Sequence, residues 1–400
     1  MKFEWKESEL FDAVSLVIDY RGKTPKKLGG DWVSNGYRAL SAKNIKTGQI
    51  VQPETIRYVS REMYKQWMKE EIRNGDIIIT SEAPFGEVFY WNSDEKIVLS
   101  QRLFGVRIKD EFDSAFMYYY MTSDAFQGEL RARATGTTVI GLRQPELLKC
   151  KIRYPHIDTQ KKIASILMTI DEKINLNNAI NNNLQQQAQA LFKAWFVDFE
   201  PFGGEMPTEW RLGKLKDVLR LKRDGIKVGD EPSLPYLPID IIPMKTFAVS
   251  EFKPNEDAQS SLITFDKDDI VIGAMRVYFH RVIFAPCRGI TRTTCFTLKP
   301  YDADFLSFGL LCCDQDSSID YAQTTSKGST MPYAVWEGGL GDMEIAIPSK
   351  DVAKKFNDTV LPMLHHIQES YFENRNLVKL RDSLLPKLMN GEIDVSNIEI

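Results

Sequence analysis

Residues 155–199 read PHIDTQKKIASILMTIDEKINLNNAINNNLQQQAQALFKAWFVDF. At helical spacing, side chains three and four residues apart gather on one face. About 35 helical residues at ~1.5 Å each span roughly 50 Å, which is long for a globular helix. The segment is therefore predicted to be a long helix that needs a partner helix. Its stripe is formed by Ile163, Leu167, Ile170, Ile174, Asn177, Asn181, Leu184, Ala188, Leu191 and Trp195.

A second stretch with the same pattern occupies residues 348–395, PSKDVAKKFNDTVLPMLHHIQESYFENRNLVKLRDSLLPKLMNGEIDV. It aligns with the first without a gap, so that Asn374 occupies the position equivalent to Asn181, and Leu384 the position equivalent to Leu191. We expect the two helices to pack as an antiparallel coiled coil that holds two domains apart. Asn181 and Asn374 would then be buried amides that fix the register of the pair.

An alternative is that the two segments are ordinary long helices, each buried in its own domain. Pro362 and Pro386 favour this alternative slightly, because proline inside a helix removes a hydrogen bond and bends the rod.

The composition is that of a soluble globular chain of two or three domains, with 43% hydrophobic and 26% charged residues. The first residues, MKFEWKESELF, are charged where a signal peptide would be apolar, and no apolar run is long enough to span a membrane. We therefore expect a cytoplasmic protein without membrane contact. The net charge of −4 argues against indiscriminate coating of nucleic acid, yet basic residues cluster locally.

Motifs for catalysis and metal binding are missing from the sequence. The Gly22-Lys23-Thr24 triplet has no upstream glycine to complete a phosphate loop. Neither an NPPY-type methyltransferase motif nor a glycine-rich turn for a methyl donor is found. The five cysteines have no CxxC spacing, and the four histidines are scattered. We expect no catalysis, no metal and no bound cofactor in this chain.

The segments that precede the two helices repeat one another as a framework. Trp210 and Leu215 correspond to Trp5 and Leu10, and the run DDIVIG from residue 268 corresponds to GDIIIT from residue 75. Short strand candidates and one or two helices in each segment predict a mixed α/β (α+β) class. Two divergent copies on one framework fit a bipartite target such as DNA, whose half-sites recur about 34 Å apart per turn.

On these residues the chain resembles the specificity (S) subunit of type I restriction-modification systems. The similarity is carried by Gln160–Ala164 with SILMTIDEKINLN, by LFKAWFVDFEP from residue 191, and by LRDSLLPKLMNGEI from residue 380. RGKTP from residue 21 and the turn Gly136–Thr138 are also typical. The second helix departs from the pattern at Ala353, Arg381 and Pro362, which puts its straightness in doubt.

The resemblance implies target recognition domains at residues 1–156 and 201–348, with helical spacers at 157–200 and 349–400. Each domain would read one half of an asymmetric double-stranded DNA site. The helices would set the spacing and dock two methyltransferase (modification) subunits, which recruit restriction (translocase-nuclease) subunits. The assembled complex would be an adenine-specific DNA methyltransferase and ATP-dependent endonuclease. S-adenosylmethionine, ATP and Mg²⁺ are expected only in the partner subunits.

DNA contacts are expected from loop residues that can pair with bases or phosphates. In the first domain they are Arg21, Lys23, Thr24, Lys43, Asn44, Ser81, Glu82, Phe85, Gln101, Arg102, Thr135, Thr137 and Thr138. In the second domain they are Lys222, Arg223, Arg276, Tyr278, Arg292, Thr293, Lys327, Ser329 and Thr330.

Partner docking is expected at the helix ends, through Phe192, Phe196 and Phe199, which lie off the seam, and through Leu385 and Met389 near the end of the other helix. Three other interpretations stay open. The chain could serve another restriction class, it could be a coiled-coil protein adaptor that does not bind DNA, or it could be an enzyme whose motif is not recognised.

Overall fold

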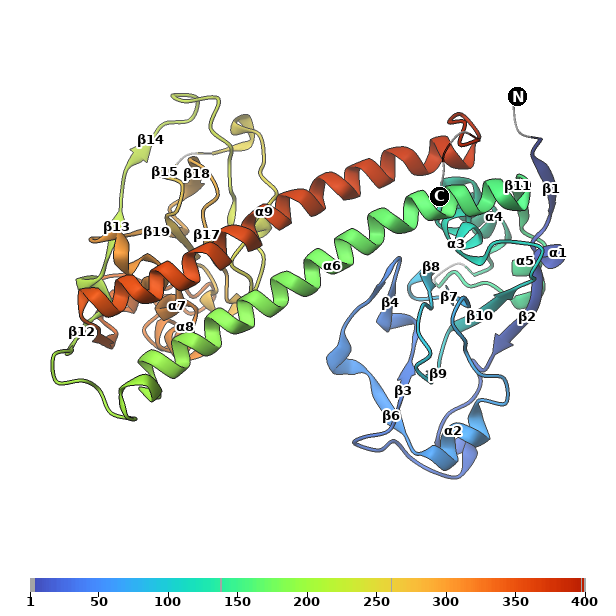
Figure 1. Cartoon of the computed structure of the whole chain (residues 1–400), viewed down its shortest axis with the longest axis horizontal. Helices are drawn as coiled ribbons and strands as arrows, with labels where there is room; N and C mark the ends of the chain where they lie inside the picture. Colours follow the sequence, from blue (N-terminus) through green and yellow to red (C-terminus); the bar gives the residue numbers. More distant parts are fainter. Residues whose placement is uncertain (1–3, 137–138, 260, 397, 399–400) are drawn as a thin grey trace. The chain divides into compact units, whose positions relative to one another are not determined.

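The computed structural model describes residues 4–136, 139–259, 261–396 and 398 (Figure 1). The chain forms two compact units. Unit 1 comprises Met1–Glu172 and Val378–Ile400, and unit 2 comprises Lys173–Leu377. Both units mix helices with largely antiparallel sheets, so the predicted fold class is confirmed.

Unit 1 is built on a four-stranded sheet in the order β2-β10-β7-β8. A two-stranded sheet, β1-β11, and a three-stranded sheet, β6-β3-β9, complete its main β-structure. Its strands are β1 (Lys6–Glu9), β2 (Val14–Asp19), β3 (Tyr37–Leu40), β4 (Ile45–Lys46), β5 (Gln49–Ile50), β6 (Arg57–Val59), β7 (Ile77–Ser81), β8 (Phe85–Tyr90), β9 (Val98–Leu99), β10 (Leu103–Ile108) and β11 (Lys151–Tyr154). Its shorter helices are α1 (Leu10–Ala13), α2 (Arg61–Trp67), α3 (Ser114–Thr122), α4 (Asp124–Arg133) and α5 (Gln144–Leu148).

Unit 2 repeats this framework. The sheet β13-β19-β16-β17 corresponds to β2-β10-β7-β8, and β12-β20 corresponds to β1-β11. The third sheet, β14-β15-β18, is paired differently from its counterpart, so the repeat is confined to the framework. The strands are β12 (Arg211–Lys214), β13 (Leu219–Lys222), β14 (Gly225–Ile226), β15 (Leu262–Phe265), β16 (Ile270–Gly273), β17 (Val282–Phe284), β18 (Gly289–Arg292), β19 (Cys295–Pro300) and β20 (Glu344–Ile347). The helices are α7 (Leu306–Asp314) and α8 (Asp316–Thr324).

The central strands explain why the apolar runs were continuous in sequence. Successive side chains of a strand point to opposite faces of its sheet. Ile77 and Ile79 of β7 belong to one hydrophobic core, whereas Ile78 belongs to another. In β16, Ile270 and Val271 are divided between two cores in the same way. Both faces of each sheet are therefore covered, which requires apolar residues at every position.

The two predicted long helices are confirmed as α6 (Ile157–Phe196) and α9 (Lys350–Met389), each of 40 residues. Helix α9 continues through both Pro362 and Pro386. Each helix has residues in unit 1 and residues in unit 2.

Within unit 2, the two helices pack antiparallel through amide groups. Asn177 Nδ2 donates to Asn374 Oδ1 at 2.9 Å, and Asn374 Nδ2 donates to Asn178 Oδ1 at 2.9 Å. The expectation for Asn374 is only partly right, because its side chain is half-buried. Asn181 is buried as expected, but neither polar atom of its side chain has a hydrogen-bond partner within the described part of the chain.

Within unit 1, Arg381, which departs from the pattern of the first helix, forms an ion pair with an aspartate of α6. Arg381 Nη1 lies 2.8 Å from Asp171 Oδ1, and the other oxygen of Asp171 accepts a hydrogen bond from the Tyr119 hydroxyl at 2.7 Å. The side chains of Arg381 and Asp171 are 30% and 22% exposed, so the pair is screened less than a surface salt bridge.

We predict that Arg381→Ala lowers the free energy of unfolding of unit 1 by roughly 1–2 kcal/mol, because Asp171 loses its charged partner. Thermal denaturation monitored by circular dichroism checks this. Lys379→Ala, at an exposed position of the same helix, is the control. Equal melting temperatures for the two variants would contradict the prediction.

Candidate nucleic-acid interface

In unit 1, three loops meet beside the ends of β7 and β10. They are the β7–β8 turn, the segment before β10 and the segment after α4. Main-chain bonds fix them, because Ser81 N–H donates to Arg102 O at 2.8 Å and Leu142 N–H donates to Ser81 O at 3.0 Å. Together the loops enclose a pocket of about 370 Å³. Its lining is Arg21, Ser81, Glu82, Gln101, Arg102, Thr135, Val139, Gly141, Leu142 and Arg143.

Six of the residues predicted to contact DNA line this one pocket. Arg102 Nε lies 2.9 Å from Glu82 Oε1, and both side chains are more than a third exposed. Arg21 is less available, because its guanidinium bonds to Asp19 and to Leu142 O and lies over the Phe104 ring. Thr137 and Thr138 lie outside the described residues.

The sequence analysis missed four lining residues, Val139, Gly141, Leu142 and Arg143, and their neighbour Ile140. Val139 and Ile140 are 52% and 46% exposed, although both are apolar. The sequence did contain a signal for this pair. Val139 and Ile140 directly follow a Gly-Thr-Thr sequence, where a buried strand is not expected to begin, so their apolar side chains could have been predicted to be exposed.

Two other residues predicted to contact DNA, Lys23 and Thr24, make hydrogen bonds within unit 1. Lys23 Nζ donates to Trp67 O at 2.7 Å and lies 4.3 Å from the centre of the Tyr20 ring. Burial lowers the pKa of Lys23. The Thr24 hydroxyl accepts a weak hydrogen bond from Lys27 N–H at 3.3 Å.

The prediction for Asn44 is wrong, because its side chain is 1% exposed and closes a turn. Its Oδ1 accepts from Ser41 N–H, and its Nδ2 donates to the Thr55 hydroxyl at 2.9 Å. The neighbouring Lys43 is exposed. Phe85 is half-buried and packs against the core of unit 1.

Unit 2 builds the same loop arrangement with the same main-chain bonds. Ala274 N–H donates to Thr294 O at 2.9 Å, and Ala334 N–H donates to Ala274 O at 2.8 Å. The β16–β17 turn and the segment after α8 are joined further by Arg276 N–H, which donates to Pro332 O at 2.8 Å. Exposed side chains on these segments are Arg276, Tyr278, Thr293, Lys327, Ser329, Thr330, Met331 and Tyr333. Arg292 is half-buried, and Met331 and Tyr333 were not predicted.

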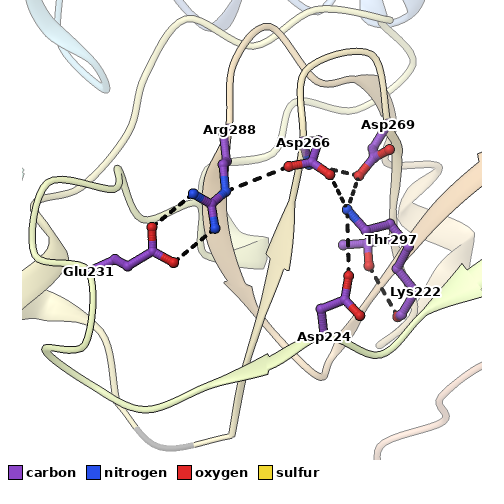
Figure 2. Close-up of polar contacts among 7 residues, drawn as sticks. All are labelled: Lys222, Asp224, Glu231, Asp266, Asp269, Arg288 and Thr297. Atoms are coloured by element: carbon purple, nitrogen blue, oxygen red, sulfur yellow. Dashed lines mark hydrogen bonds and ion pairs between the residues drawn. The ribbon is translucent and has the colours of Figure 1, made fainter.

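The prediction for Lys222 is wrong, because its ammonium is enclosed by carboxylates (Figure 2). Lys222 Nζ lies 2.7 Å from Asp266 and 2.8 Å from Asp269, and its side chain is 8% exposed. The bond to Lys222 lowers the pKa of Asp266, whereas burial raises the pKa of Asp269. Its neighbour Arg223 remains exposed.

The same cluster holds the loop that follows β14. Arg288 makes two bonds of 2.8 Å to Glu231 and lies 3.6 Å from Asp266 (Figure 2). In unit 1, Asp76 at the equivalent position is also buried, and its partner is Arg107 at 2.8 Å. Each unit therefore neutralises one buried aspartate, with a cation from a different strand.

We predict that Lys222→Ala destabilises unit 2 by about 3–5 kcal/mol, because it leaves the Asp269 carboxylate buried without its cation. Arg220→Ala, at an exposed position of the same strand, should have little effect. Urea denaturation of both variants measures the difference. Loss of DNA binding by Lys222→Ala without loss of stability would show that Lys222 contacts DNA after all.

Phe192, Phe196 and Met389 are 4%, 6% and 4% exposed, so the expectation that these predicted docking residues form an exposed surface is wrong. These residues belong to the cores of their units, because the helix ends are covered on more than the seam face. Phe199 is half-buried and packs edge-on against Trp210.

Two grooves nevertheless border these helix ends at equivalent positions of the repeat. The groove in unit 1, of about 370 Å³, is lined by Leu385 and Met389 with the α3–α4 junction. The groove in unit 2, of about 480 Å³, is lined by Phe192 and Phe196 with the α7–α8 junction. At the offset of the repeat, Leu385 corresponds to Phe192 and Met389 corresponds to Phe196.

The described residues contain no group of three or more His, Cys, Asp or Glu side chains arranged to hold a metal ion. Four of the cysteines are buried, and burial raises the pKa of Cys150 to about 12 and that of Cys295 to about 11. Among the described helices, none has the length and apolar character needed to cross a bilayer.

Several known proteins are similar to this chain in sequence or in structure. Residues 3–186 match the family model described as the type I restriction modification DNA specificity domain. Over this part, the chain is similar to type I specificity subunits. The MjaIX specificity subunit of Methanocaldococcus jannaschii is 24% identical, with 86% of this chain and 83% of the relative aligned. The HindI specificity subunit of Haemophilus influenzae is 25% identical, with 81% of this chain and 88% of the relative aligned.

Among solved structures, the S subunit from M. genitalium has the same fold as this chain. The TM-score is 0.66 at 16% sequence identity, and the match covers 96% of each chain. The resemblance expected from the sequence is confirmed by the family-model match and by the two curated relatives.

Proposed function

We propose that this chain is a non-catalytic, DNA-reading component of a type I restriction-modification enzyme, in which each unit reads one half of a bipartite site. One observation carries the proposal. The same three-loop arrangement is built twice by equivalent main-chain hydrogen bonds, but its exposed side chains differ. A shared scaffold that presents Glu82 and Arg102 in unit 1, and Arg276 and Tyr278 in unit 2, suits two different base sequences.

Selection from a randomised duplex library by the full chain tests this function. We expect the selected duplexes to share two conserved blocks separated by a fixed gap. Mapping of methylated adenines in the source genome should return the same motif. Selection without sequence enrichment would favour a protein adaptor that does not read DNA.

Substitution of one arginine in each unit should separate the two half-sites. Arg102→Ala should weaken binding to one block by about 1–3 kcal/mol if the guanidinium holds a guanine bidentately. Arg276→Ala should weaken binding to the other block only. Affinities for duplexes altered in one block at a time measure the effect. Equal loss on every sequence would reassign either arginine to phosphate contact.

The paired helices are proposed to set the gap between the two blocks. Two helices of 40 residues, each contributing to both units, support this role. The number of residues in a helix fixes its length, because each residue adds about 1.5 Å.

The two equivalent grooves support docking of two copies of one partner, which we propose to be the methyltransferase subunit. Restriction subunits would join through these partners, which would also supply S-adenosylmethionine, ATP and Mg²⁺ chemistry. A subunit that reads chromosomal DNA for a restriction-modification enzyme would act in the cytoplasm, which we propose as its location.

Each groove should accept its partner independently. Leu385→Glu in unit 1 and Val197→Glu in unit 2 each put a charge into one groove, so each should reduce the bound methyltransferase subunits from two to one. Native mass spectrometry of the reconstituted complex counts them. Leu380→Glu, at an exposed position of α9, is the control. Two bound subunits in both groove variants would contradict this docking.

A further inference from the structure

The β16–β17 turn of unit 2 has a backbone that needs external support. It carries Arg276 and Tyr278, both exposed, on a short 3-10 turn (Val277–Phe279). Arg276 and His280, which flank this turn, have φ angles of 50° and 51°. These values lie in the left-handed region, which residues with a β-carbon adopt only when their surroundings hold them there.

His280 ties the end of this turn to the helices behind it. Its imidazole is buried, and Nε2 lies 2.9 Å from Asp314 Oδ1 at the end of α7. The second oxygen of Asp314 accepts a hydrogen bond from Gln189 Nε2 of α6 at 2.8 Å. The main chain adds one more bond, because His280 O accepts from Lys245 N–H at 2.8 Å.

Unit 1 secures the start of β8, directly after the equivalent β7–β8 turn, without a histidine. Gln127 Nε2 of α4 donates to Gly86 O and to Met121 O, each at 2.9 Å. An amide does not titrate in the physiological range. The two reading loops are therefore both held by a nearby helix, but through groups of different chemistry.

We propose that His280 is a positioning residue, whose bond to Asp314 holds Arg276 and Tyr278 in the conformation that reads the second half-site. This proposal rests on the proposed DNA-reading function. It adds that the reading of one half-site, by unit 2, is controlled by a histidine. Because only unit 2 depends on a histidine here, the two half-sites should respond differently to pH.

The charges around His280 set the direction of this response. Asp314 and Asp316 face the ring, Lys245 lies near it, Lys193 lines the adjoining pocket, and Arg281 follows in the chain. Burial alone would lower the pKa of His280, but the bond and charge of Asp314, helped by Asp316, raise it overall. A raised pKa in the folded state gives stability that is complete below the unfolded value of about 6.5. That stability is lost as the pH rises through the folded pKa.

The test uses the full chain and the duplex selected from the randomised library. Its affinity is measured at pH 6 and pH 8.5, against duplexes altered in one block at a time. We expect discrimination in the block read by unit 2, identified by Arg276→Ala, to fall roughly five-fold or more at the higher pH. Discrimination in the block read by unit 1 should stay constant.

Three variants separate positioning from general stability. His280→Ala should lose discrimination in the second block at both pH values, and His280→Gln should lose the pH dependence. Asp316→Asn changes an exposed carboxylate, so the fold should be unaffected while the transition moves to lower pH. The NMR titration of the His280 ring in the wild-type chain and in Asp316→Asn gives a readout that does not depend on DNA.

The outcomes distinguish the two proposals. If no duplex is selected at either pH, the DNA-reading function itself is overturned. If a two-block motif is selected but both blocks respond equally to pH, or if His280→Ala reads the second block as well as wild type, only the role of His280 is overturned.

Discussion

Each unit depends on apolar packing between residues that are far apart in the sequence. The core of unit 2 joins Phe192 and Phe196 of α6 to Phe356 and Val360 of α9. The core of unit 1 likewise joins Ile163 and Leu167 to Leu388. Neither core is complete without both long helices, because burial of these side chains supplies the main stabilising free energy. The sheets and their loops are positioned on this packed base.

The helices and the repeated framework were predictable because their signals are periodic. A stripe repeating every three and four residues identifies a helix whatever lies beside it. The equivalence of Leu384 with Leu191 extended that signal to a second copy. The helix ends were not predictable, since Phe192 and Phe196 are covered by sheet and helix elements that no single seam describes.

The candidate interface was predictable only as a group of loops. Glu82, Gln101 and Arg102 meet because strand ends bring them together, and turn chemistry indicated those ends. Lys222 and Asn44 failed for a shared reason. A polar side chain reads the same in sequence whether it faces solvent or satisfies a buried partner, and both of these residues bond within the fold.

Although the two units share a framework, the buried aspartates Asp76 and Asp269 should prevent the exchange of single strands between them. Asp76 takes its cation from β10, whereas Asp269 takes its cation from β13, which is equivalent to β2. A hybrid domain that combined strands from both copies would leave one carboxylate without a counter-charge, or two cations facing each other. Exchange of recognition modules between related genes should therefore succeed for entire units and fail for single strands.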